Sequence, residues 1–100
     1  MITKEQITER AKNNIETVTV DGLDGEVRVK KLTFRDVGRC KGKADADAWI
    51  VALGIVEEDS KQMFTVEETK DLPADIFLPL RDAVMEASGL KTPPADTEKN

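Results

Sequence analysis

The sequence predicts an α+β fold: one small domain in which a β-hairpin packs against three or four helices. The chain has 100 residues, which suits one domain and is too short for two independent cores. Two segments that alternate valine with polar residues stand on either side of a glycine-containing turn, and helix-capping patterns precede the other apolar segments. We expect the domain to span residues 1–90. Residues 91–100 contain two prolines and no large apolar side chain, which predicts a disordered tail.

The hairpin is predicted from residues 16–20 and 26–30. In both segments the valines fall on one face and polar residues on the other, which is typical of a strand with one buried and one solvated face. Two glycines in the connection can adopt the positive φ angles that tight turns need. Ahead of the hairpin, Thr3 and Gln6 have the spacing of a capping box, so we expect a short surface helix that ends near residue 13.

The next two helices are predicted after the hairpin. Thr33 and Asp36 have the spacing of a helix N-terminus. Residues 45–56 are apolar on nearly every side, which predicts a helix buried on more than one side and capped by Asp45 or Asp47. A buried strand is the alternative for this segment, because it is rich in Val and Ile.

Two further helices complete the predicted fold. Thr65 and Glu68 form another capping-box pattern, for a helix of one or two turns. The last helix is expected to have Pro73 in its first turn and to run to Ser88. Gly89 follows it, where a glycine can take the conformation that stops a helix, with Leu90 as its apolar companion. Pro79 lies inside this pattern, and we expect it to kink the helix or delay its start.

The composition argues against catalysis. There is no histidine, and Cys40 is the only cysteine, so histidine bases, His/Cys zinc sites and an intramolecular disulfide are excluded. The neighbouring Arg39 and Lys41 would lower the pKa of the Cys40 thiol, but no histidine is present to act as its base. The aspartates lack the spacing of a calcium loop. We therefore expect a non-enzymatic protein with no cofactor and no metal site.

The charge and hydropathy of the chain restrict its partners and its location. The net charge is −5 and the isoelectric point is near 4.8, which disfavours nucleic acid and anionic membranes as partners. The longest uncharged segment, residues 48–56, is far shorter than the roughly 20 residues that span a bilayer. The first residues lack the apolar region of a signal peptide. We expect the protein to stay in the cytoplasm.

Charges are distributed unevenly along the chain. Residues 28–43 contain seven basic residues and one acid, whereas residues 57–71 contain six acids and two lysines. This pattern favours head-to-tail association, in which the basic part of one copy meets the acidic part of the next. An ordinary mixed surface and nucleic-acid binding by residues 28–43 are the alternatives. The predicted charged rim consists of Arg28, Lys30, Arg35, Arg39, Glu57, Glu58, Asp59, Glu67 and Glu68.

An apolar contact surface is predicted around the only tryptophan. A lone tryptophan in an apolar segment most often belongs to the core. The alternative is that part of this helix, with the following Met-Phe pair, contacts another subunit or an apolar client. We expect the residues that hold the helical core to border this surface as well; they are Trp49, Leu53, Val56, Met63 and Phe64.

The order of these motifs is similar to that of a known family. A strand pair, VTV at 18–20 and EVRV at 26–29, precedes LTFRD at 32–36 and WIVALGIV at 49–56. An acidic loop, MFT at 63–65 and a last helix that ends in ASGL at 87–90 follow. Over about residues 15 to 90 this order resembles the small tail assembly chaperones of long-tailed (siphovirus-type) bacteriophages and prophages.

The resemblance implies a non-enzymatic factor of virion morphogenesis. Such proteins coat the long, partly apolar tape measure protein, self-associate, and hold their client ready for tail tube subunits. The implied partners are therefore the tape measure protein, further copies and the tail tube protein, in the host cytoplasm and not in the mature virion. The resemblance also implies −1 frameshifting, and residues 98–100 can be encoded by the slippery heptamer A AAA AAC. A small structural component of the tail or its connector is the alternative function.

Overall fold

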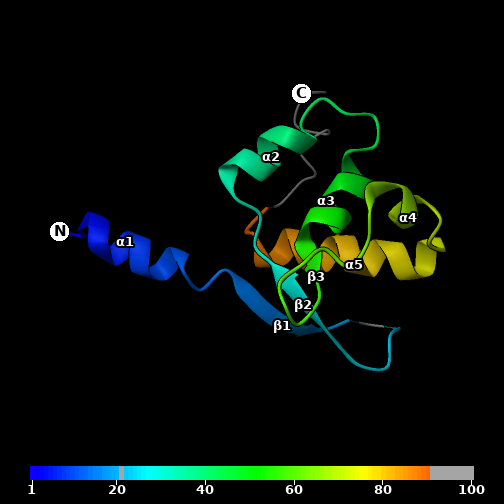
Figure 1. Cartoon of the computed structure of the whole chain (residues 1–100), viewed down its shortest axis with the longest axis horizontal. Helices are drawn as coiled ribbons and strands as arrows, with labels where there is room; N and C mark the ends of the chain where they lie inside the picture. The colour runs from blue at the N-terminus through cyan, green and yellow to red at the C-terminus, as the bar shows by residue number, and fades with distance from the viewer. Residues whose placement is uncertain (21, 91–100) are drawn as a thin grey trace.

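The computed structural model describes residues 1–20 and 22–90, and it confirms the α+β prediction (Figure 1). The tail predicted for residues 91–100, including the frameshift position, lies outside the described residues. The helices and strands of the described part are α1 Lys4–Ala11, β1 Ile15–Thr19, β2 Glu26–Lys30, α2 Phe34–Cys40, α3 Ala46–Gly54, β3 Ile55–Val56, α4 Val66–Lys70 and α5 Ala74–Ala87.

The sheet has three antiparallel strands in the order β1-β2-β3. The predicted hairpin forms its first two strands, with Val18 opposite Val27. The third strand pairs with the other edge of β2, where Ile55 lies opposite Val29. Helices α3 and α5 pack against the sheet, so the valine face of the hairpin is covered as the alternation predicted (Figure 1).

The core lies between the sheet, α3 and α5. Its fully buried side chains are mostly β-branched, as a core with few aromatic residues requires. Gly54 lets the end of α3 approach α5 closely, because a Cβ at this position would overlap the side chain of Val84. The residues with no exposed surface include Val29, Cys40, Ile50, Val51, Ile55 and Val84.

The segment predicted as one helix over residues 45–56 divides into two elements. Helix α3 ends at Gly54, and Ile55 and Val56 form β3. A glycine weakens the helix at this point, while the two β-branched residues gain a strand partner in β2. The helix prediction and its strand alternative therefore each apply to a different part of the segment.

The predicted side-chain cap of α3 is wrong. Asp45 occupies the N-cap position, but its side chain makes no capping hydrogen bond. Its carboxylate instead lies 3.0 Å from Nζ of Lys70, at the end of α4. Asp47 lies inside the first turn, where its charge still suits the positive end of the helix.

The other helix starts follow the sequence prediction. Each of α1, α2 and α4 begins with a reciprocal capping box, in which the threonine hydroxyl accepts one backbone N–H and the third helical residue accepts the other. The backbone N–H of Thr65, for example, donates to Oε1 of Glu68 at 2.8 Å. The three pairs are Thr3 with Gln6, Thr33 with Asp36, and Thr65 with Glu68.

Helix α5 starts before its internal proline. It begins at Ala74 and continues past Pro79, so the predicted delay of its start is wrong. The proline removes only one backbone hydrogen bond, near the beginning of the helix. The predicted C-terminus is confirmed: Gly89 has φ 74°, and the N–H of Leu90 donates to the carbonyl of Met85 at 2.8 Å.

Helix α1 projects away from the rest of the molecule (Figure 1). None of its residues is buried, and Ile2 and Ile7 are 61% and 56% exposed. The prediction of a surface helix is confirmed, although it ends at Ala11 and not near residue 13.

Candidate functional site

The predicted apolar surface is only partly at the surface of the molecule. Val56 is 1% exposed, so its assignment to a contact surface is corrected: it is an interior residue. Trp49, Leu53 and Phe64 are half-buried and pack against the core, and Met63 is 38% exposed. Four of these five residues therefore keep some surface that a partner can reach.

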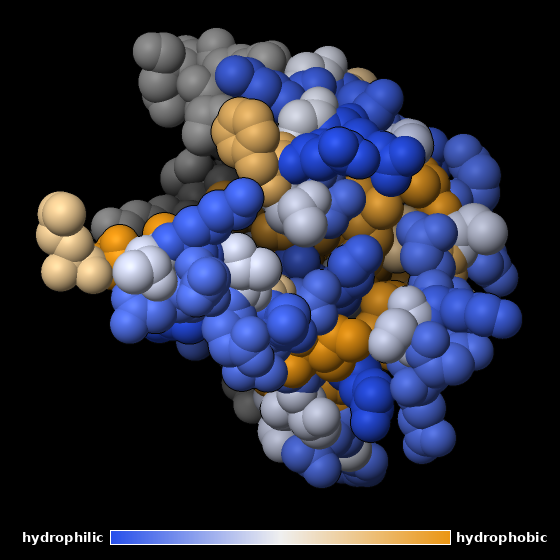
Figure 2. All heavy atoms as spheres, turned by 60° about the vertical axis from the view of Figure 1, so that its left-hand side comes forward, coloured by the Kyte–Doolittle hydropathy of each residue, from blue (hydrophilic) through white to orange (hydrophobic). Residues whose placement is uncertain are grey.

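Most of the segment 48–56, part of which was expected to contact another subunit or an apolar client, is covered by the chain itself. Helix α3 contacts α2, α4, α5 and the sheet, and Ile50, Val51 and Ala52 have no exposed surface. Figure 2 shows that, on the face in view, hydrophobic residues form small patches separated by hydrophilic ones. The large apolar residues that are exposed belong to other segments; they are Met1, Ile2, Ile7, Phe34, Met63 and Leu78.

Sequence reasoning did not assign Phe34 and Leu78 to a contact surface. Phe34 is 95% exposed at the first position of α2, and Leu78 is 43% exposed on α5. A signal for Phe34 is present in the sequence, because the residue one turn later is Gly38 and provides no apolar partner on that face. Phe34 therefore presents a whole aromatic side chain to solvent.

Trp49 is partly shielded by a cation. The Nζ of Lys43 lies 4.7 Å from the centre of the indole ring, which is a cation–π contact. Lys43 belongs to the loop between α2 and α3. A partner that binds at this position would have to displace or include the ammonium group.

The segment after β3 folds back over the outer face of the sheet. Val56 lies opposite Arg28, so both side chains point to the face of the sheet away from the core. The N–H of Met63 donates to the carbonyl of Ile55 at 3.2 Å, and Nε2 of Gln62 donates to the carbonyl of Ala52 at 2.9 Å. This loop explains why Val56 is buried although it does not belong to the main core.

The predicted basic residues divide into two groups. Arg35 and Arg39 are exposed on α2, beside the exposed Phe34. Arg28 and Lys30 lie on β2, and Nη1 of Arg28 donates to the carbonyl of Glu58 in the same chain at 3.2 Å. The α2 group is therefore the basic surface that remains most open to a partner.

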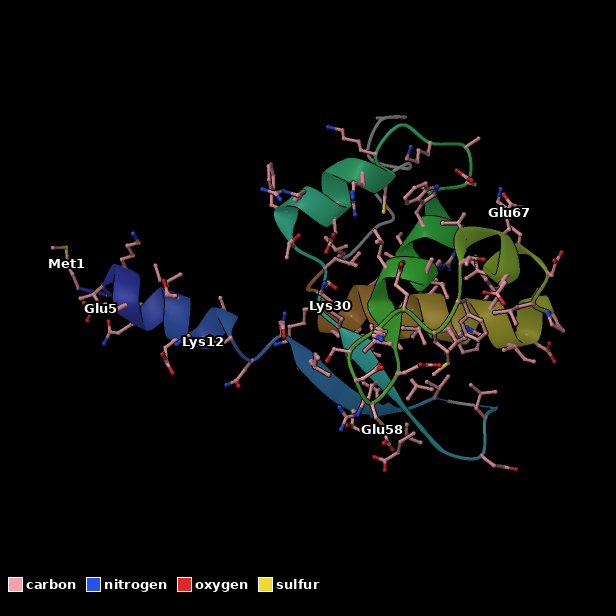
Figure 3. All side chains as sticks on the ribbon, in the orientation of Figure 1. Met1, Glu5, Lys12, Lys30, Glu58 and Glu67 are labelled. Carbon is pink, nitrogen blue, oxygen red and sulfur yellow. The ribbon has the colours of Figure 1, made fainter. Side chains whose placement is uncertain are left out.

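The predicted acidic residues also do not form one surface. Figure 3 shows Glu58 in the loop after β3 and Glu67 on α4, well separated from each other. Glu67 lies 3.2 Å from Nζ of Lys70, and Glu68 closes the capping box of α4. In the loop, Asp59 accepts the N–H of Lys61, while Glu57 and Glu58 are exposed.

The basic and acidic helices lie on different sides of the molecule. Figure 1 places α2 and α4 on opposite sides of α3. Arg35 and Arg39 belong to the first helix, and Glu67 and Glu68 to the second. Two complementary surfaces on different sides of one chain are the arrangement that head-to-tail association requires.

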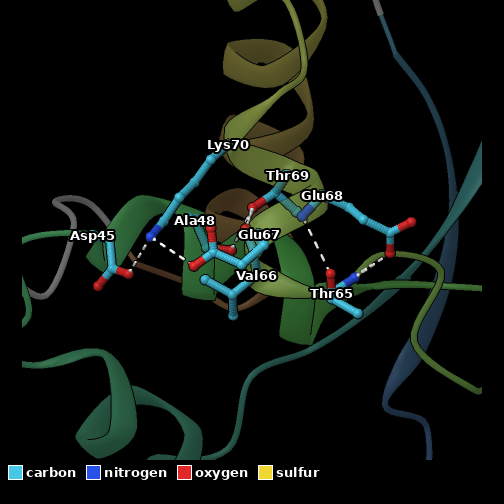
Figure 4. A network of polar contacts seen from close by, with 8 residues as sticks. All are labelled: Asp45, Ala48, Thr65, Val66, Glu67, Glu68, Thr69 and Lys70. Atoms are coloured by element: carbon cyan, nitrogen blue, oxygen red, sulfur yellow. Dashed lines mark hydrogen bonds and ion pairs between the residues drawn. The ribbon is translucent and has the colours of Figure 1, made fainter.

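An open groove lies between α3, α4 and α5. Its volume is about 360 Å³. Figure 4 shows the polar contacts beside it: Lys70 joins Asp45 and Glu67, and the Thr69 hydroxyl donates to the carbonyls of Val66 and Ala48. The hydrogen bond from Lys70 lowers the pKa of Asp45 and raises that of Lys70. The groove is lined by Asp45, Ala48, Thr69, Lys70, Leu72, Ala74, Phe77 and Leu78.

Cys40 is not an activated thiol. It is fully buried, and burial followed by the nearby Asp36 carboxylate raises its pKa to about 11. This is opposite to the direction that the flanking Arg39 and Lys41 would produce. A thiol with such a high pKa is a poor nucleophile at neutral pH.

Residues 1–20 and 22–90 contain no group of three or more acidic or cysteine side chains placed to hold a metal ion. In the same part of the chain, no helix combines the length and the apolar character that crossing a membrane requires.

The surfaces described above suit contacts with other macromolecules. They combine exposed apolar side chains, an open groove and two charged helices on different sides of a small domain. Neither a protein-family model, nor a curated protein, nor a solved structure matches this chain.

Proposed function

We propose that the protein is a non-enzymatic tail assembly chaperone of a long-tailed bacteriophage or prophage. It would bind the tape measure protein and self-associate during tail morphogenesis in the host cytoplasm. The observation that carries the proposal is the separation of surfaces on one small domain: an apolar groove, a basic face on α2 and an acidic face on α4. The order of the sequence motifs supports the same function.

The groove between α3, α4 and α5 is the proposed site for an apolar client helix. Leu72 and Phe77 are half-buried in its wall, and Leu78 is 43% exposed at its edge. An amphipathic helix binds such a groove by placing its apolar stripe against these side chains. Covering the stripe would keep an otherwise insoluble segment in solution until the tail tube protein replaces the chaperone.

Self-association is proposed to use the two charged helices. The exposed Arg35 and Arg39 of one copy would face Glu67 and Glu68 of the next, with Phe34 as the apolar contact between them. Such exposed charge pairs are screened by salt. Their main effect is to orient the copies, while the aromatic side chain contributes buried area.

Co-expression with the tape measure protein encoded in the same phage genome tests the proposal. The chaperone should keep this client soluble and be recovered with it. Replacing Leu78 by aspartate should reduce recovery, whereas the same change at the exposed Ile7 on α1 should not. A client that is equally insoluble with and without the protein would contradict the proposal.

Mass spectrometry of purified virions separates a chaperone from a structural component. A chaperone should be missing from the particle, whereas a tail or connector subunit should be present in many copies. A gel-shift experiment at low salt separates both from a DNA-binding regulator, which would act through residues 28–43.

A further inference from the structure

The two edges of the sheet differ in whether they are closed. The edge at β3 is covered by its own loop, since Val56 bridges to Gln62 and the N–H of Met63 bonds to Ile55. The other edge is β1, which pairs only with β2 among the described residues and lies at the outside of the sheet (Figure 1). Within residues 1–20 and 22–90, the β1 edge is therefore the one that can accept another strand.

The hydrogen-bond register shows which backbone groups of β1 are available. The carbonyl of Asn14 accepts the N–H of Lys31 at 2.6 Å, directly ahead of the paired residues of the hairpin. Backbone groups in an antiparallel pair point alternately toward and away from the partner strand. The N–H and C=O groups of Ile15, Thr17 and Thr19 therefore point to the open edge.

A groove runs along this edge, between β1 and α5. It consists of two adjoining hollows of about 260 and 270 Å³, which share Val18, Ala83 and Glu86. The α5 residues in its wall are spaced three and four positions apart, so they form one stripe along the helix. This stripe consists of Pro79, Asp82, Ala83, Glu86 and Ala87.

The groove combines small apolar side chains with carboxylates. Ala83 and Ala87 leave room for the side chains of an added strand, and Asp82 and Glu86 are exposed beside them. Asp82 lies 3.1 Å from Nη2 of Arg81, whereas Glu86 forms no ion pair with any described residue. The groove therefore has unbalanced negative charge and favours a basic ligand.

We infer that the open edge of β1 binds an extended, basic segment of a partner protein by strand addition. Backbone groups of the segment would pair with Thr17 and Thr19, and its alternate side chains would lie over Ala83 and reach Glu86 with lysine or arginine. The inference deepens the proposed function and rests on it for the identity of the partner, a segment of the client.

A second copy is a less suitable occupant than a basic segment. Symmetric pairing of two β1 strands would bring the carboxylates of Asp82 and Glu86 toward the same groups of the other copy. Like charges that face each other across a sheet are destabilising. A basic segment of another protein avoids this repulsion and neutralises the carboxylates.

The test uses the full-length protein and a labelled nine-residue peptide, Thr-Lys-Thr-Val-Thr-Lys-Thr-Val-Thr. Its lysines and valines share one face of the extended chain, as the groove requires. Fluorescence anisotropy should show saturable binding that weakens with salt, and a matched peptide with glutamate in place of lysine should bind about tenfold more weakly. Hydrogen exchange should slow at the amides of Thr17 and Thr19 on binding.

Two variants of the protein separate strand addition from other modes of binding. Thr17→Pro removes an edge N–H at a position where an edge strand tolerates proline, and Glu86→Lys reverses a charge without touching the backbone. Each should weaken peptide binding about tenfold. Glu57→Lys, the same charge change on the loop after β3, should leave binding unchanged.

If both variants bind the peptide as tightly as the wild type does, or if the wild type does not bind the peptide at all, the inference is overturned. Failure of the proposed function gives a different result. If the peptide binds and the tape measure protein is not kept soluble, the edge inference stands and the proposed function fails. If the client is kept soluble equally by the wild type and by Thr17→Pro, the proposed function stands and the edge inference fails.

Discussion

Replacing Gly54 by alanine tests the close packing of α3 against α5. A Cβ at this position would overlap the side chain of Val84, which has no exposed surface. Neither side can give way easily, since Val84 is enclosed and Gly54 is followed directly by β3. Gly54→Ala should therefore destabilise the fold, although alanine is the better helix former.

The size of the destabilisation by Gly54→Ala follows from two opposing effects. Overpacking a well-packed core costs about 1–3 kcal/mol, and exchanging glycine for alanine inside a helix returns about 0.5–1 kcal/mol. We expect a net loss of about 1–2 kcal/mol in the free energy of unfolding. For a domain of this size a loss of 1 kcal/mol lowers Tm by about 4–8 °C.

Urea titration followed by circular dichroism measures this loss, and Gly38 offers a matched control. Gly38 is also helical, but nothing lies within 4 Å of the Cβ that an alanine would add. Gly38→Ala should therefore stabilise the protein by about 0.5–1 kcal/mol. In addition, Val84→Ala removes the methyl groups that overlap the added Cβ. It should therefore lower the free energy of unfolding less in the Gly54→Ala background than in the wild type. A Gly54→Ala variant that gains as much stability as Gly38→Ala would refute the packing argument.

Three further outcomes are expected. Burial raises the pKa of Cys40 from 9.0 to about 11, so the unfolded chain loses the thiol proton at a lower pH than the folded protein does. The free energy of unfolding should therefore fall by about 3 kcal/mol as the pH rises from below 9 to above 11, and urea titrations across this range should show a smaller loss for Cys40→Ala. Thr65→Ala removes the cap of α4 and should cost about 1 kcal/mol by thermal unfolding, whereas Thr3→Ala should leave global stability unchanged, because α1 buries no residue. Arg39→Glu should reduce self-association in sedimentation velocity at low salt more than Arg10→Glu on α1, and a wild type that is monomeric at every salt and protein concentration would contradict the proposed assembly.

Features that depend on a few neighbouring residues were predictable from the sequence. The three capping boxes each rest on a threonine and on the residue three positions later, so their hydrogen bonds form wherever the helix starts. The end of α5 likewise needs only Gly89 and the apolar residue after it. The hairpin follows from the alternation of valines within two short segments.

Features that depend on distant residues were not predictable in the same way. Whether Ile55 and Val56 continue a helix or pair as a strand depends on β2, which lies about 25 residues earlier in the chain. The burial of Val56 depends on a loop that folds back from the other side. The sequence pattern alone presented residues 48–56 as one apolar unit, and the actual division after Gly54 reflects the pairing of Ile55 and Val56 with β2.

The charged residues show how separation along the chain differs from separation in space. Arg28 and Glu58 belong to oppositely charged segments, yet Arg28 hydrogen-bonds the backbone of Glu58 within one molecule. Pairing across the sheet brings these segments together, so Arg28 already has a hydrogen-bond partner in the loop after β3 of its own chain. A neighbouring copy can instead reach charges on helices that do not pack on each other. On the basic side, these charges are Arg35 and Arg39 of α2. Salt-sensitive assembly should therefore depend on α2 far more than on β2, although the sequence places basic residues on both.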